Sequence, residues 1–384
     1  MRIAFYAPMK APTHPVPSGE RQMARLLWAA LEMAGHEVSL ASPFRSYDAS
    51  GCARRQRRLA AIGNRLADRM LAHYRSRPAA QRPQMWFTYH LYHKAPDWLG
   101  PTVSRALDIP YVVAEASSAP KQAQGSWAAA YTAASHAIAG AELVIILNRS
   151  DRPCLAPLVA PPHRLATLRP FIVADPFLRA VANRDRHRRE LAQRLALDSD
   201  EPMLLTVAMM RFGDKLSSYV VLGHALKRIA DRPWTLVVSG DGPARADVEQ
   251  ALAAISGRVR WLGLVEEYAL PAVYAAADLY VWPAVNEAYG LAFLEAQAAG
   301  LAVIAGRCGG VPDVVGDGET GCLVPAGDAV AFAWAVARLL EDPARRRAMA
   351  RRAASRILTH HDLAAASAAL AALVDPLFRA GASA

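Results

Sequence analysis

The sequence has no run of about 18 uncharged apolar residues, the length that a membrane-spanning helix needs. Its N-terminus, MRIAFYAPMK, lacks the apolar core and the small-residue cleavage site of a secretory signal. Cysteine is scarce, and no CxxC pair occurs among Cys52, Cys154, Cys308 and Cys322. Neither a disulfide framework nor a zinc site is therefore indicated, and we expect a cytoplasmic protein with reduced cysteines.

What is present is typical of a globular enzyme. The chain has 384 residues, of which 53% are hydrophobic and 20% charged, a length that favours two domains of roughly 150 to 200 residues. The net charge of +10 favours an anionic partner such as a nucleotide diphosphate or an anionic lipid headgroup. Nucleic acid would also fit this charge, but the arginines lack interleaved aromatic residues, and we expect no nucleic-acid partner.

The first half alternates between strand and helix patterns. Residues 2–7 form an apolar strand pattern, residues 21–35 an amphipathic helix ended by Gly35, and residues 36–42 a second strand. The same order recurs at residues 106–117 and again before residues 141–149. Such alternation predicts a parallel sheet covered by helices.

A polar, arginine-rich stretch at residues 183–201 separates this region from a second series of strands and helices. We therefore predict an N-terminal domain at residues 1–182 and a C-terminal domain at residues 183–359, with a helix at about 360–384 packing back on the first. The predicted fold class is α/β, with two doubly wound domains facing each other. Ligands of such sheets bind outside the carboxyl ends of the strands, so we expect the chemistry in the cleft between the domains.

The segment AVNEAYGLAFLEAQAAG follows a strand pattern, with Gly290 at the start of a helix and Gly300 at its end. Free N–H groups at a helix start bind anionic oxygens. Glu287 and Glu295 are about two helical turns apart, which tends to place both carboxylates on one side, where they can accept hydrogen bonds from sugar hydroxyls. The spacing alone fits a strand-to-helix connection with two solvated glutamates equally well.

These residues resemble the paired-glutamate motif of glycosyltransferase family 4, whose members are retaining enzymes with the GT-B fold of two facing Rossmann-like domains. The motif residues are Glu287, Ala288, Tyr289, Gly290 and Glu295. The flanking segments at 261–283 and 309–328 are similar to the family's own, and the loop with Ser18 and Gly19 resembles its glycine loop. The resemblance covers nearly the whole chain and is strongest from about Thr206 to Asp328.

The resemblance implies transfer of a sugar, with retention, from a nucleotide-diphosphate donor to a glycan or lipid-linked acceptor, in cell-envelope or exopolysaccharide biosynthesis. It implies no metal and no cofactor. Glu295 would bind the ribose hydroxyls and Glu287 the transferred sugar. Arg211 and Lys215, in AMMRFGDK, resemble the basic pair that holds the donor diphosphate, although loop cations are often merely solvated.

Further donor contacts follow from the same resemblance. They would be made by Tyr289, Gly290 and Leu291 in the motif and by Gly19, whose backbone would approach the phosphates closely. A lone glycine in a proline-rich loop is more often only a turn.

One position departs from the family pattern. Members often carry a histidine at the end of the strand that reads IPYVVAEAS here, and this chain has Glu115 in its place. A carboxylate binds hydroxyls but takes no cationic role, so we expect a different sugar pocket. His90 and His93, in FTYHLYHKAP, are alternative candidates for the histidine role, and ordinary loop histidines are an equally good interpretation.

Two other strings invite misinterpretation. The DxD motif of metal-dependent glycosyltransferases occurs at Asp198, Ser199 and Asp200, in the polar connector. Because acidic residues in such connectors commonly form turns, we interpret this motif as a turn and predict no metal site. GDGP at residues 240–243 lacks the third glycine of a dinucleotide fingerprint, which disfavours an oxidoreductase.

A sugar-nucleotide isomerase or hydrolase of the same fold, without an acceptor, is the alternative function.

Residues 54–82 form a basic amphipathic helix pattern. Its apolar positions are Leu59, Ile62, Leu66 and Met70. Its arginines are Arg54, Arg55, Arg57, Arg58, Arg65, Arg69, Arg75, Arg77 and Arg82. A core-facing stripe with a solvated basic face is the ordinary interpretation, and the alternative is peripheral docking on an anionic membrane at its inner face.

Overall fold

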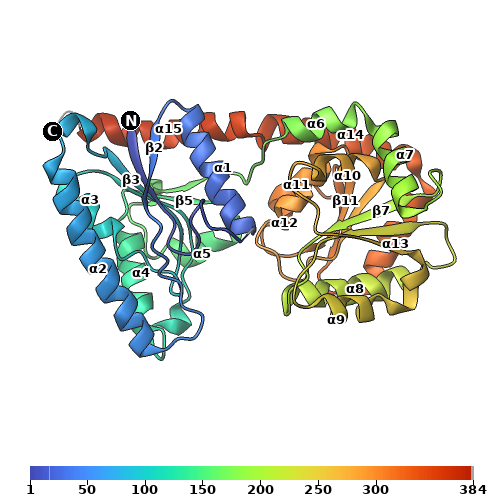
Figure 1. Ribbon diagram of the computed structural model, residues 1–384, viewed down its shortest axis with the longest axis horizontal. Helices are drawn as coiled ribbons and strands as arrows, with labels where there is room; N and C mark the ends of the chain where they lie inside the picture. The colour runs from blue at the N-terminus through green and yellow to red at the C-terminus, as the bar shows by residue number, and fades with distance from the viewer. Residues whose placement is uncertain (17, 382–384) are drawn as a thin grey trace. The chain divides into compact units, whose positions relative to one another are not determined.

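A computed structural model describes residues 1–16 and 18–381, and the chain divides into two compact units. The first unit comprises Met1–Arg169 together with the segment that begins at Leu363, and the second comprises Pro170–Asp362 (Figure 1). Each unit contains one six-stranded parallel sheet. The predicted α/β class with two doubly wound sheets is confirmed.

The sheet of the first unit has the order β2-β1-β3-β4-β5-β6. Its strands are β1 (Arg2–Tyr6), β2 (Glu37–Ser42), β3 (Met85–Leu91), β4 (Tyr111–Ala116), β5 (Leu143–Ile146) and β6 (Leu165–Thr167). Its helices are α1 (Gly19–Met33), α2 (Ala53–Ser76), α3 (Gly100–Leu107), α4 (Ala128–Gly140), α5 (Arg152–Leu155) and α15 (Leu363–Gly381), with short 3₁₀ turns η1 (Ala79–Gln81), η2 (Pro120–Gln122), η3 (Arg149–Asp151) and η4 (Pro162–Arg164).

The sheet of the second unit has the order β12-β11-β10-β7-β8-β9. Its strands are β7 (Met203–Val207), β8 (Thr235–Ser239), β9 (Val259–Gly263), β10 (Leu279–Trp282), β11 (Ala302–Arg307) and β12 (Gly321–Pro325). Its helices are α6 (Asp175–Val181), α7 (Arg184–Leu195), α8 (Asp214–Lys227), α9 (Arg245–Ala251), α10 (Leu270–Ala276), α11 (Leu291–Ala298), α12 (Val311–Val314), α13 (Ala329–Glu341) and α14 (Pro343–His360), with η5 (Ala253–Arg258) between α9 and β9.

Burial of the strands follows from their composition. The central strands are short apolar runs, and every residue of β8 and β10 is buried. Parallel strands of this kind need helices on both faces of the sheet. Figure 1 shows α8 and α9 on one side of the second sheet and α10 and α11 on the other. Loops at the carboxyl ends of the strands are thereby left for binding.

The second unit begins earlier than residue 183, where the sequence placed the domain boundary. Helix α6 packs on α10, with the rings of Phe177 and Tyr274 at a centroid distance of 5.7 Å. At the other end, α15 packs on α1 of the first unit, and the Ser367 hydroxyl donates to the Ala30 carbonyl at 2.8 Å. The apolar face of α6, which cannot be assigned to a unit from sequence, decides where the boundary falls.

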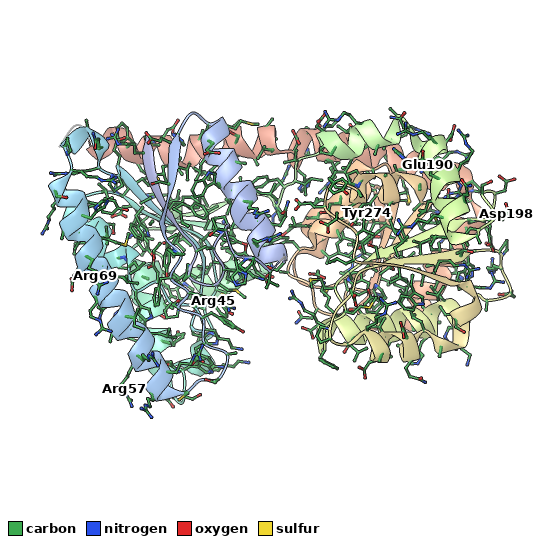
Figure 2. The ribbon with its side chains drawn as sticks, in the orientation of Figure 1. Arg45, Arg57, Arg69, Glu190, Asp198 and Tyr274 are labelled. Atoms are coloured by element: carbon green, nitrogen blue, oxygen red, sulfur yellow. The ribbon has the colours of Figure 1, made fainter. Side chains whose placement is uncertain are left out.

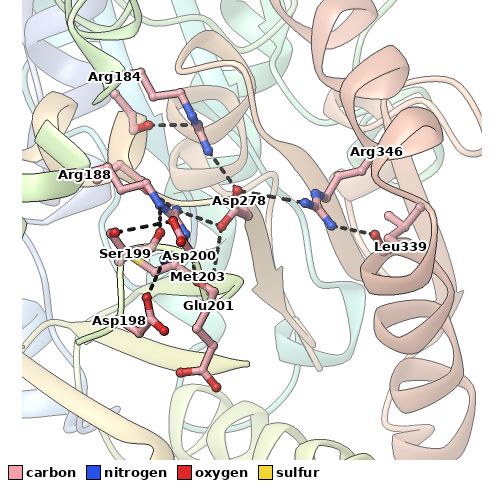
Figure 3. Close-up of polar contacts among 12 residues, drawn as sticks. Arg184, Arg188, Asp198, Ser199, Asp200, Glu201, Met203, Asp278, Leu339 and Arg346 are labelled. Atoms are coloured by element: carbon pink, nitrogen blue, oxygen red, sulfur yellow. Dashed lines mark hydrogen bonds and ion pairs between the residues drawn. The ribbon is translucent and has the colours of Figure 1, made fainter. Parts of the chain in front are cut away.

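The arginine-rich stretch that we interpreted as a connector is an integral part of the second unit. Arg184 and Arg188 of α7 donate to the two carboxylate oxygens of Asp278 at 2.9 and 2.8 Å, and Arg346 of α14 approaches the same carboxylate at 4.0 Å (Figure 3). Asp278 also accepts from the Met203 backbone N–H at 2.9 Å. One carboxylate before β10 thus ties α7, α14 and β7 together.

The DxD string forms a turn beside this cluster. The Asp198 carboxylate accepts a hydrogen bond from the Asp200 backbone N–H at 2.9 Å, and the Ser199 carbonyl accepts one from Arg188 (Figure 3). Within residues 1–16 and 18–381 no group of three histidine, cysteine or acidic side chains is arranged to hold a metal ion. Over the same residues, no helix is both long and apolar enough to cross a bilayer.

Candidate functional site

The candidate site of the second unit lies at the carboxyl ends of β7 and β10. These strands are neighbours in the sheet, and the chain leaves them in opposite directions, from β7 toward β8 and from β10 toward β11. Such a reversal of strand order opens a crevice above the sheet, the usual ligand site of a doubly wound fold. The loop 208–213 after β7 carries Arg211, and Lys215 lies in the first turn of the following helix α8. The loop 283–290 after β10 carries Glu287, and Glu295 lies in the following helix α11.

Lys215 and Glu287 form the central contact of this site. The Lys215 Nζ donates to Glu287 Oε2 at 2.5 Å, and it also lies 5.4 Å from the centre of the Trp282 ring. The Lys215 side chain is 33% exposed and that of Glu287 is 17% exposed. The ammonium keeps further donors and remains reachable from solvent, so the same group can bind an incoming anion.

Arg211 lies in the loop after β7, partly buried. Its guanidinium donates to the Met209 sulfur at 3.3 Å, and no carboxylate of the described chain forms an ion pair with it. Backbone hydrogen bonds hold this loop against the loop after β8: Ala208 donates to Ser239, Met210 to Asp241 and Ala244 to Met210. The GDGP segment therefore forms the predicted strand-to-helix turn, and it braces the loop that carries the arginine.

The loop after β10 is held by glycine contacts that the sequence did not disclose. Gly309 has φ +47°, and a Cβ there would lie 2.0 Å from the Glu287 carbonyl oxygen. The adjacent Gly310 N–H donates to the Ala288 carbonyl at 2.6 Å. Only glycine permits this close approach of two backbones, and it fixes the loop from which Glu287 projects.

Helix α11 begins at Leu291, directly after Gly290 in the left-handed region at φ +70°. Gly300, at φ +71°, follows its last turn. The helix is thus bounded by the two glycines that the sequence indicated, and Leu291 is its first residue. The Tyr289 side chain is 7% exposed and packs inward instead of pointing into solvent.

Glu295 is partly buried within α11. Its Oε2 accepts a hydrogen bond from the Tyr274 hydroxyl at 2.7 Å, and Tyr274 lies in the interior of the unit (Figure 2). Burial raises the pKa of Glu295, while the bond from Tyr274 acts in the opposite direction. Burial chiefly raises the pKa of Tyr280, and the charges of Glu295 and Glu287 raise it further.

In the first unit, α1 begins at Gly19 and is capped by Ser18. The Ser18 hydroxyl accepts from the Arg21 N–H at 3.2 Å and from the Lys10 ammonium at 2.8 Å. A Cβ at Gly19 would meet no atom within 4 Å. Packing within the chain therefore does not explain a glycine here, and the helix start has open space beside it.

Glu115 and His90 lie together, at the ends of the neighbouring strands β4 and β3. Both have left-handed backbones, at φ +56° and +63°, which is uncommon for residues other than glycine. His90 Nδ1 is 4.0 Å from Glu115 Oε1. Asp151, after β5, joins them: burial and then the charge of Glu115 raise its pKa to about 6. The sequence did not single out Asp151, because its proximity depends on the strand order.

His93 points elsewhere. Its ring lies 5.4 Å from the Trp127 ring, centre to centre. Burial, and then the charges of Lys94 and Lys121, lower the pKa of His93. Of the two candidate histidines, His90 is therefore the one beside Glu115, and His93 belongs to a separate group of residues.

Comparison with known proteins gives a family for the second unit. Residues 201–342 match the family model described as glycosyl transferases group 1. The chain is 32% identical over 213 residues to an alpha-D-kanosaminyltransferase of Streptomyces kanamyceticus, covering 55% of this chain and 53% of the relative. It is 36% identical over 206 residues to a D-inositol 3-phosphate glycosyltransferase of Salinispora tropica, covering 50% and 42%. The match spans about half, or less, of these curated relatives, and it confirms the family resemblance over residues 201–342.

Solved structures resemble the chain over nearly its whole length. A sucrose-phosphate synthase from Thermosynechococcus elongatus has a TM-score of 0.73 at 22% identity, covering 99% of both chains. Anabaena Alr3699/HepE in complex with UDP-glucose has a TM-score of 0.70 at 15% identity, covering 98% of this chain and all of that one. At these identities the likeness shows the fold, and the predicted GT-B class is confirmed.

Proposed function

We propose that this protein is a retaining glycosyltransferase that transfers a sugar from a nucleotide-diphosphate donor to a hydroxyl of a glycan or lipid-linked acceptor. The observation that carries the proposal is the Lys215–Glu287 pair at the point in the second sheet where the strand order reverses, with Arg211 in the loop after β7. A cation for the diphosphate and a carboxylate for the sugar lie next to each other there. Relatives named as glycosyltransferases support the same activity.

In this proposal the donor binds the second unit. Lys215 and Arg211 hold the diphosphate, and Glu287 accepts hydrogen bonds from hydroxyls of the transferred sugar. Glu295 accepts from the ribose hydroxyls, and these bonds offset the desolvation that raises its pKa. Gly290 and Leu291 supply backbone at the start of α11, and the packed Tyr289 ring supports that turn.

Two positions of the first unit have proposed roles in binding. The open backbone at Gly19 leaves room for a phosphate at the start of α1. Glu115 stands where the family often has a histidine, and we propose that it binds a hydroxyl of the sugar or the acceptor, held in place by His90.

The chemical step is a substitution at the anomeric carbon. The bond between this carbon and the diphosphate oxygen breaks, and the acceptor oxygen bonds to the carbon on the same face. The acceptor proton passes to the departing diphosphate. Lys215 and Arg211 stabilise the charge that develops on the diphosphate, so the protein contributes positioning and electrostatics. No metal or cofactor is required, and the nucleotide sugar is a substrate.

Donor binding and transfer are tested separately. Thermal-shift measurements with UDP, GDP, ADP and their sugar conjugates should reveal one stabilising base, since a bound ligand raises the melting temperature according to its occupancy. The matching labelled sugar nucleotide, incubated with a mixture of glycans and lipid-linked oligosaccharides in EDTA, should then give product only when acceptor is present. Acceptor-independent release of sugar, or an epimerised donor, would favour the hydrolase or isomerase alternative.

A second proposal concerns α2 and the location of the protein. Its apolar side packs into the first core through Leu66 and Met70, and its arginines project outward, as Arg57 and Arg69 do in Figure 2. We propose that this basic face binds anionic lipid on the inner face of the cytoplasmic membrane, where lipid-linked acceptors of envelope polysaccharides are found.

Cosedimentation with vesicles tests the lipid proposal. Replacing the exposed Arg54, Arg57 and Arg58 with Glu should abolish binding to vesicles that contain phosphatidylglycerol. The matched control replaces three exposed arginines of α14, Arg345, Arg347 and Arg351, with the same change of net charge. Equal loss in both variants would mean that net charge alone drives the association, and no loss in the first would refute a role for α2.

A further inference from the structure

A small hollow lies in the first unit, apart from the donor residues. It is lined by the loop after β2, the first turns of α2, the loop after β3 and the start of α4. These loops belong to the carboxyl ends of their strands, the edge of the sheet where ligands bind. The hollow has room for about one water-sized group.

Three buried polar atoms on residues lining this hollow have no hydrogen-bond partner within the described chain. They are Asp48 Oδ2, His93 Nε2 and Trp98 Nε1. Asp48 is only 2% exposed. A buried polar atom without a partner costs free energy, and native proteins rarely leave several of them together. Their grouping around one hollow therefore points to a bound polar group.

The carboxylate of Asp48 is prepared to accept a hydrogen bond. Its other oxygen, Oδ1, already accepts from the Ser50 backbone N–H at 3.0 Å and from the Ser50 hydroxyl at 2.7 Å. Arg55 Nε is 3.3 Å from the same oxygen. Burial opposes ionisation of Asp48, but these bonds and the charge of Arg55 outweigh it and lower its pKa. Asp48 is thus held ionised, and its Oδ2 is left to accept a hydrogen bond.

The three atoms restrict the chemistry of the missing group. The indole N–H of Trp98 can only donate, and the Asp48 carboxylate can only accept. An ammonium cannot accept from the indole, and an ionised phosphate or carboxylate oxygen cannot donate to Asp48. A neutral hydroxyl both donates and accepts, and the uncharged imidazole of His93 can complete its bonding.

The remaining wall combines an aromatic ring, a cation and an apolar side chain. Trp127 is 8% exposed, its ring is 5.4 Å from that of His93, and the Lys94 ammonium lies 5.9 Å from its centre. Leu59 adds an apolar side chain. We propose that Asp48, His93, Trp98 and Trp127 form an acceptor pocket that takes one hydroxyl of a neutral polyhydroxylated ring. This inference rests on the proposed function for the identity of the ring as acceptor.

Ligand-observed NMR tests the pocket without any turnover. The full chain is titrated with two neutral rings, myo-inositol and methyl α-glucoside, and with an anionic and a cationic ring, inositol 1-phosphate and 2-deoxystreptamine. We expect a neutral ring to bind at least about tenfold more tightly than the charged ones, because a charged substituent in the hollow leaves Asp48 or Trp98 without its hydrogen bond. Absence of binding by both neutral rings would overturn the proposal.

Trp98→Phe is the decisive variant, since it removes the N–H and keeps an aromatic ring. We expect about fivefold weaker binding of the neutral ring, the loss of one hydrogen bond. Any fall in the melting temperature should reflect only the smaller ring, because this N–H has no partner in the described residues. Trp334→Phe, at an exposed position of α13, is the control and should change neither value. Equal affinity in wild type and Trp98→Phe would show that the hollow holds ordered water only.

The outcome is separable from that of the proposed function. If UDP or another nucleotide binds while neither neutral ring does, the acceptor pocket is refuted and the donor site stands. If the rings bind as expected and no nucleoside diphosphate binds, the ring-binding pocket is supported and the glycosyltransferase proposal is refuted. Asp48→Asn serves as a second variant, with a loss of more than about tenfold in ring affinity because the bond it removes is charge-assisted.

Discussion

Replacing Lys215 with Met separates a donor-binding role from a structural one. Methionine keeps an unbranched side chain against Trp282 and removes only the charge. The Lys215–Glu287 pair is partly exposed, at 33% and 17%, so its contribution to the unfolding free energy should be about 0.5–1 kcal/mol. An ammonium bound to a diphosphate oxygen is a hydrogen bond between charged groups, which contributes about 1.5–3 kcal/mol. We therefore expect donor affinity to fall roughly 10- to 100-fold with little change in stability.

Isothermal titration of the nucleoside diphosphate and urea unfolding measure the two effects on the same preparation. Lys227→Met, at the exposed last position of the same helix, removes one positive charge far along α8 and should leave both values unchanged. Glu287→Gln should leave diphosphate affinity nearly intact and lower turnover, because Glu287 is assigned to the sugar. If Lys215→Met lowers diphosphate affinity by less than about threefold, Lys215 does not hold the diphosphate. If it greatly lowers the free energy of unfolding, the Lys215–Glu287 pair serves mainly to stabilise the fold.

Three further predictions concern the framework of the two sites. Gly309→Ala should lower the free energy of unfolding by about 1–3 kcal/mol and weaken donor binding, because its Cβ would meet a carbonyl of the β10 loop. The control, Gly318→Ala, also has a positive φ but lies in open space, so it should lower stability without changing donor affinity. Asp278→Asn should lower the free energy of unfolding in urea by about 2–4 kcal/mol, because the guanidiniums of Arg184 and Arg188 lose their anion. The control, Asp175→Asn at an exposed ion pair, should lower it by less than about 0.5 kcal/mol. The raised pKa of Asp151, about 6, means that the folded state holds its proton more tightly than the unfolded state, so its contribution to stability falls as pH rises from about 4 to 6. Asp151→Asn should therefore be more stabilising at pH 7 than at pH 4, and equal effects at both pH values would contradict this.

The sequence by itself predicted the features whose causes are local. Apolar runs gave the buried strands, and Gly290 and Gly300 marked the ends of α11, because left-handed backbone at a helix end favours glycine regardless of the surroundings. The order of loops and strands also placed Lys215, Arg211 and Glu287 after strands, and hence at one edge of a sheet. The family motif added their roles as an interpretation.

Tertiary structure decided everything that depends on which strands are neighbours. The arginines of α7 belong to the stretch that we interpreted as a connector, and their partner, Asp278, lies some ninety residues away in the chain. Asp151 joins Glu115 and His90 only because β3, β4 and β5 are adjacent. The unsatisfied atoms of Asp48 and Trp98 are likewise invisible in sequence, since burial and hydrogen bonding are properties of the packed chain. Local backbone propensity depends on single residues and their neighbours in sequence. The pairing of charges and the burial of polar atoms without partners depend on which segments pack together in the fold.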